Sequence, residues 1–233
     1  MNEEITETSK AIQEVAKTSG KAIDGIREFC GFIAKYTAGS IQEACGIFED
    51  KLKYARWKNQ ARLMLKAKKF LKEQGLDAPD KSIPFKLAVP LLQAASLEDD
   101  DYLQDMWAKL LVNSATKNSN VDLQRMYIDI LERLSPFDAK ILEKIYSIPY
   151  EEAMHKLIIV SWLPERIELD QKKERPSKYP QPSEEMKLSL LNLDRLNCLA
   201  ICISMGGGQI FQAVNQTLLG KNFIAACTIK KDN

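Results

Sequence analysis

The chain has 233 residues, of which 45% are hydrophobic and 28% charged, a composition close to that of ordinary globular proteins. This composition excludes a chain that is disordered throughout. The formal net charge of +1 excludes a global field directed at nucleic acid or an anionic membrane, so such a partner would need a local patch.

The N-terminal segment, residues 1–39, is predicted to contain an amphipathic helix over about residues 11–35, where small or apolar residues recur at steps of four and three. Because alanine, serine and glycine dominate this seam, the helix buries little and needs a partner surface. The open alternatives are the rest of the chain, a second copy and a membrane interface. The candidate membrane-contact or self-association face comprises Ile23, Ile26, Phe29, Phe32 and Ile33.

A long helix is predicted from Ser40, which can form a capping box with Glu43, to Gln74, before a left-handed cap at Gly75. One stripe of this helix is apolar and the remainder is basic. The basic side is a candidate patch for nucleic acid or another anionic surface, unless it pairs within the fold with the acidic turn at residues 98–105. This patch comprises Lys51, Lys53, Arg56, Lys58, Arg62, Lys66 and Lys69.

Three further helices complete a predicted core domain, residues 40–134. Pro84 and Pro90 mark a short or kinked helix over residues 85–95. Ser96 and Asp99 are interpreted as the cap of the next helix, whose acidic first turn suits the positive end of the dipole. Its apolar face contains Leu103, Met106, Trp107, Leu110 and Leu111. The last helix shows the same spacing at Leu123, Met126, Tyr127, Ile130, Leu131 and Leu134.

Residues 135–233 are predicted to form an α+β module. Ser135 and Pro136 begin its first helix as N-cap and first-turn proline. The later elements are a stretch at 153–163 that fits helix or strand, a charged, proline-rich mobile loop at 165–182, a helix from Ser183 to Leu196, a β-hairpin around Gly206–Gly208, and a helix at 217–227.

The sequence lacks the catalytic motifs that can be recognised by spacing: a phosphate-binding loop, HExxH and a nucleophile elbow. The acidic residues at 98–101 fan around a helix and cannot converge on one metal ion. Cys198 and Cys202 lie four apart, but the only histidine, His155, is distant, so all five cysteines are expected to be reduced thiols. We therefore expect no enzyme activity, no metal and no cofactor.

A succession of motifs in the middle of the chain resembles the abortive-infection alpha family. They are Lys51–Gln60, Pro90–Asp100, Leu103–Ala108, Leu110–Asn113 and Leu134–Leu142. The resemblance extends over about residues 10–227 and implies a role in bacterial phage defence, in which infected cells stop growing or die before phage release. It implies no catalytic residues. The family-motif residues expected to act as packing anchors are Tyr54, Trp57, Leu103, Trp107 and Pro136.

The C-terminal part is similar to winged-helix domains, with Leu193–Leu196 in place of the recognition helix and Thr217–Lys221 in place of the trailing helix. It departs from their pattern at Asn197–Cys198, where a glycine commonly ends the recognition helix. The expectation is a mainly α protein with a helical core and a C-terminal winged-helix-like module. Its expected function is that of a non-enzymatic effector or sensor-effector in phage defence, acting through protein or membrane contact. The alternatives are a winged-helix DNA-binding regulator and an adaptor for another defence component. The acidic start at Met1–Glu4 lacks the layout of a secretory signal, so we expect a cytoplasmic protein that is membrane-associated, if at all, when active.

Overall fold

The computed structural model describes residues 31, 35–36, 54–154, 156–170 and 176–229. The described chain is mostly helical, with one four-stranded antiparallel sheet near the C-terminus, which confirms the predicted mainly α fold class. It divides into two compact units, one whose described part ends at Leu123 and one from Gln124 to Ile229.

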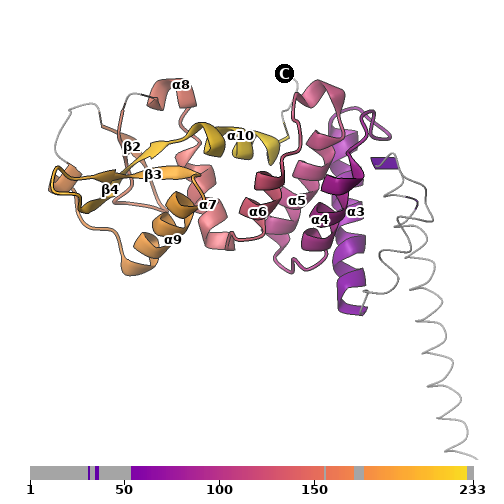
Figure 1. Ribbon diagram of the computed structural model, residues 1–233, viewed down its shortest axis with the longest axis horizontal. Helices are drawn as coiled ribbons and strands as arrows, with labels where there is room; N and C mark the ends of the chain where they lie inside the picture. Colours follow the sequence, from indigo (N-terminus) through magenta and orange to yellow (C-terminus); the bar gives the residue numbers. More distant parts are fainter. Residues whose placement is uncertain (1–30, 32–34, 37–53, 155, 171–175, 230–233) are drawn as a thin grey trace, which may run out of the picture. The chain divides into compact units, whose positions relative to one another are not determined.

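The first unit is built on three helices that lie side by side, α3 (Tyr54–Glu73), α4 (Phe85–Ala95) and α5 (Asp101–Ser114), followed by the 3-10 turn η1 (Lys117–Ser119) (Figure 1). The side-chain hydrogen bonds between the α3 and α5 segments occur in the same order along both of them. Asn59 bonds Asp99 near the start of α5, and Gln74, after the end of α3, bonds Asn113. The two helices therefore run in the same direction, and α4 is the return between them.

Local chemistry defines the ends of these helices. After α3, Gly75 has φ +71°, and Leu76 N–H donates to Leu71 O at 2.9 Å, which is the predicted left-handed cap. The predicted cap of α5 at Ser96 and Asp99 is wrong. Asp100 is the N-cap, accepting from the backbone N–H groups of Tyr102 and Leu103. Ser96 instead donates to Gln93 O at 2.7 Å at the end of α4.

The second unit begins with α6 (Arg125–Leu131), α7 (Pro136–Ile145) and α8 (Tyr150–Ala153). α6 is shorter than predicted, and Met126, expected on its apolar face, is 49% exposed. The predicted start of α7 is confirmed, because Ser135 and Asp138 form a reciprocal capping box with Pro136 as the first helical residue.

The sheet has the strand order β2-β1-β4-β3, with each neighbouring pair antiparallel. The ambiguous stretch at 153–163 contains the short strand β1 (Ile158–Ile159), and the predicted loop at 165–182 contains β2 (Glu168–Leu169) and the 3-10 turn η2 (Pro176–Lys178). The loop prediction is therefore wrong at β2, while residues 171–175 lie outside the described part. α9 (Glu184–Arg195) precedes the hairpin of β3 (Leu199–Ile203) and β4 (Gln209–Gln216).

α10 (Leu218–Ala226) ends the described chain and is fixed to the hairpin by Tyr146, which follows α7. The Tyr146 hydroxyl lies 2.8 Å from Cys198 O and 3.0 Å from Thr217 O, and accepts from Thr217 N–H at 2.9 Å. Because these backbone groups precede β3 and α10, one phenol ties both elements to α7. The predicted helix at Ser183–Leu196, the hairpin and the last helix are confirmed.

Candidate functional site

Helix α9 combines a buried face with a polar and apolar stripe on its exposed side. Ser183 caps the helix by accepting from Met186 N–H at 3.2 Å. The buried face contains Met186, Ser189, Leu190 and Leu193. On the other side, at helical spacing, lie Glu185, Leu188, Asn192 and Arg195. Leu188 is 67% exposed in the middle of this stripe.

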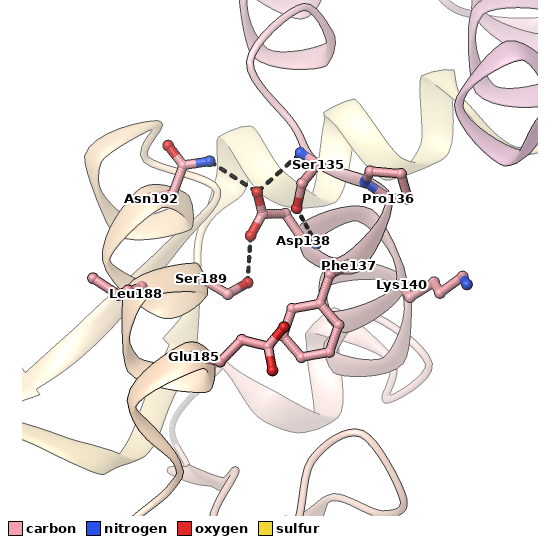
Figure 2. A pocket seen from close by; sticks show the side chains of 9 residues that line it. All are labelled: Ser135, Pro136, Phe137, Asp138, Lys140, Glu185, Leu188, Ser189 and Asn192. Atoms are coloured by element: carbon pink, nitrogen blue, oxygen red, sulfur yellow. Dashed lines mark hydrogen bonds between the residues drawn. The ribbon is translucent and has the colours of Figure 1, made fainter. Parts of the chain in front are cut away.

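A pocket of about 590 Å³ lies between α7 and α9, beside Leu188 (Figure 2). Pro136 and Phe137 contribute apolar surface from α7, and Lys140 and Glu185 bring charges of opposite sign. The remaining lining residues are Ser135, Asp138, Leu188, Ser189 and Asn192. The pocket can therefore accept an apolar side chain between two charged groups.

Asp138 is a buried carboxylate at the base of this pocket, 6% exposed (Figure 2). One of its oxygens accepts from Ser135 N–H and from the Asn192 amide, each at 3.0 Å, and the other accepts from the Ser189 hydroxyl. These three donors come from both helices, so the carboxylate joins α7 to α9. Its hydrogen-bonding capacity is used within the fold, which suits a structural role better than that of a base or a metal ligand.

The structure describes the side chains of three of the predicted packing anchors. Trp107 and Leu103 are 1% and 2% exposed in α5, as expected of core residues. Pro136 is the first residue of α7 and also lines the pocket. Tyr54 and Trp57 belong to α3, but their side chains lie outside the described residues.

The predicted basic patch is partly neutralised by the acidic residues around the start of α5. The amine of Lys66 lies 3.1 Å from Asp101 and 2.5 Å from Asp105, and the Arg62 guanidinium lies 4.0 Å from Asp101. Burial alone would lower the pKa of Lys66, but hydrogen bonds and charges from the two aspartates raise it overall. Lys69 remains 70% exposed beside Glu73. Lys51, Lys53 and the side chains of Arg56 and Lys58 lie outside the described residues.

The other predicted contact face, Ile23, Ile26, Phe29, Phe32 and Ile33, also lies outside the described residues. Within the described part, no helix combines the length and apolar character needed to cross a bilayer. In the same residues, no group of three or more His, Cys, Asp or Glu side chains has an arrangement that could hold a metal ion.

Cys198 and Cys202 are reduced thiols. Burial raises the pKa of Cys198 to about 12, so this thiol stays protonated at neutral pH. Burial also raises the pKa of Cys202. A protonated thiol is a poor nucleophile and metal ligand, so neither cysteine has the properties of a reactive site.

Sequence reasoning did not single out the pocket between α7 and α9. The available signal was Leu188, which lies on the opposite side of α9 from Met186, Leu190 and Leu193 when the sequence is placed on a helix. The pocket itself needs Phe137 and Asp138 from a helix about fifty residues earlier, and no local pattern reports that pairing.

The profile of the family described as "Abortive infection alpha" matches residues 58–227, well over half of the chain. No curated protein and no solved structure gives a significant match. The matched residues include α4 to α10 and most of α3, and with them every residue that lines the pocket. The chain belongs to the abortive infection alpha family, and this membership implies a role in phage defence.

Proposed function

We propose that this protein is a non-enzymatic effector or sensor-effector of phage defence that acts by docking a partner protein against helix α9. The observation that carries the proposal is Leu188, a leucine 67% exposed beside the pocket formed by Pro136 and Phe137. An exposed apolar anchor next to a hollow with apolar walls is typical of protein contacts. The partner would insert an apolar side chain there.

The order of elements supports a winged-helix-like arrangement of this unit. A recognition helix, an antiparallel hairpin and a trailing helix follow one another in winged-helix domains, and α9, β3–β4 and α10 follow in that order here. Winged-helix domains bind DNA or proteins, so the surface chemistry of α9 must decide between the two.

The charges on α9 favour protein over DNA. Glu184 and Glu185 form its first turn, whereas Lys187 already pairs with Glu184 at 2.7 Å and lies over the ring of Phe211. Besides Lys187, α9 carries one cation, Arg195, in its last turn. Two carboxylates on the exposed helix would repel the phosphates of a groove in which a recognition helix lies.

The N-terminal segment, residues 1–39, completes the proposal as the part that acts on a membrane or on a second partner. The ground for this is its sequence, whose small-residue seam needs a surface to pack against. Deletion of residues 1–39 should abolish protection. The remaining chain should still unfold in one cooperative transition on denaturation. Full protection by a folded deletion variant would rule out this part of the mechanism.

The docking surface is tested by infecting cells that produce Leu188→Asp. We expect loss of protection, measured as plaque count and culture survival at low and high phage multiplicity, with an unchanged denaturation midpoint. Leu65→Asp is the matched control, since Leu65 is 63% exposed in the middle of α3. Wild-type protection by a folded Leu188→Asp variant would contradict docking on α9.

A further inference from the structure

A second pocket, of about 350 Å³, lies at the C-terminal end of α9. It is formed where α6, the end of α9 and the start of α10 meet within one unit. Its lining combines two arginines with apolar side chains: Arg133, Arg195, Met126, Ile130, Leu196 and Leu219. Met126 is 49% exposed although it belongs to a helix whose other apolar residues are buried.

Neither guanidinium forms an ion pair with a carboxylate in the part of the chain that the structure describes. Asn192 lies beside both residues: its carbonyl oxygen accepts from Arg195 Nη2 at 2.7 Å, and its amide donates to the backbone oxygen of Arg133 at 3.1 Å. The pocket's own carboxylate, Asp129, lies 3.0 Å from Arg125 Nε and is paired there. The pocket therefore presents two positive charges that internal carboxylates do not balance.

We infer that this pocket binds a carboxylate side chain of an acidic and apolar peptide segment in the partner protein, an inference that rests on the proposed docking function. A guanidinium offers a planar fork of donors that matches a carboxylate with two parallel hydrogen bonds. The apolar residues beside the arginines would cover the neighbouring aliphatic side chain of the same segment. Charge complementarity and the apolar lining thus select the same ligand.

A nucleic acid fits this surface less well. Phosphate backbones are bound by cations spread along a surface, and they offer no apolar group to cover Leu196, Leu219 and Met126.

The test is a fluorescence-anisotropy titration of the full chain with a labelled peptide that alternates leucine and glutamate. A peptide with glutamine in place of glutamate, and a duplex DNA oligonucleotide, are the comparison probes. Arg133→Glu combined with Arg195→Glu should weaken binding of the glutamate peptide by at least about a hundredfold, about tenfold for each arginine. Lys156→Glu combined with Lys178→Glu makes the same change in net charge at two exposed lysines outside the pocket and should leave binding within about twofold.

The inference is overturned if the glutamate peptide does not bind, if the glutamine peptide binds equally well, if the arginine variant retains affinity, or if duplex DNA binds more tightly than the peptide. These results concern the arginine pocket alone. The docking proposal is decided separately by protection in cells that produce Leu188→Asp, so failure of one can be told from failure of the other.

Discussion

The backbone of Gly220 passes so close to Tyr146 that a Cβ atom at residue 220 would lie 2.1 Å from the tyrosine hydroxyl and 2.1 Å from Cys198 O. Both distances are far below van der Waals contact. The start of α10 can therefore approach α7 and the beginning of β3 only because residue 220 has no side chain. The same approach allows Tyr146 to bond the backbone of Thr217.

Gly220→Ala should destabilise the protein by about 3 kcal/mol, the upper end of the usual cost of forcing a methyl group into a packed interior. Chemical denaturation measures this as a lower midpoint. Three atoms would clash, Cys198 O and the Tyr146 hydroxyl and ring carbon Cζ, and Tyr146→Phe removes only the hydroxyl. Tyr146→Phe in the same chain should therefore recover part of the loss. The effects of the two substitutions should not be additive. A Gly220→Ala variant as stable as wild type would contradict the tight approach.

Trp107 is the largest fully buried side chain of the described residues, and its indole N–H has no hydrogen-bond partner there. Trp107→Ala should cost about 3–5 kcal/mol by leaving a cavity. Trp107→Phe should cost clearly less, since it fills most of the volume and removes a buried donor that makes no hydrogen bond. Urea unfolding of the three proteins gives this order. Equal costs for alanine and phenylalanine would show that the indole nitrogen, and not the ring volume, matters.

How far the sequence predicts this fold depends on how local each determinant is. The caps at Ser135, Ser183 and Gly75 follow from side-chain and backbone chemistry within a few residues, and all three predictions are confirmed. Strand β2 was missed because Glu168 and Leu169 form only a two-residue edge strand. It exists through backbone pairing with Ile158 and Ile159 and leaves no alternating pattern to detect.

The acidic residues around the start of α5 also have roles that local sequence does not determine. The cap is Asp100, where the sequence predicted Ser96 and Asp99, and three neighbouring carboxylates have other roles that depend on α3. Asp99 accepts from Asn59 at 2.8 Å, and Asp101 and Asp105 pair with Lys66. These partners lie about forty residues earlier in the chain. Spacing indicates an acidic turn suited to the start of a helix, but it could not predict which charges these carboxylates meet.

The pairing of Lys66 predicts that the basic side of α3 stabilises the first unit. Lys66→Ala should lower the free energy of unfolding by about 1–2 kcal/mol, because its side chain is only 16% exposed and two carboxylates lose their partner. Lys69→Ala is the control on the same helix, since Lys69 is 70% exposed and lies 3.8 Å from its partner Glu73. Its effect should be below about 0.5 kcal/mol. Equal effects of the two substitutions would show that the Lys66 pairs add nothing to stability.

The raised pKa of Cys198 predicts a specific loss of stability in alkaline solution. The ordinary pKa of a cysteine is about 9, and in the fold it is about 12. Between these values the unfolded chain has lost the thiol proton while the folded chain keeps it. The unfolded state thus binds fewer protons, and the free energy of unfolding falls as pH rises across this interval. Below about pH 9 both states keep the proton, and the stabilising contribution is fully present.

Cys198→Ala removes this titration, so its free energy of unfolding should fall less steeply between about pH 9 and 12 than that of wild type. Burial also raises the pKa of Tyr146, so a smaller alkaline slope should remain in the variant. The measurement is a series of urea denaturations across this pH range under reducing conditions. Parallel curves for the two proteins would show that the Cys198 thiol ionises in the folded chain as readily as in the unfolded one, which would place it near solvent instead of in the buried interior.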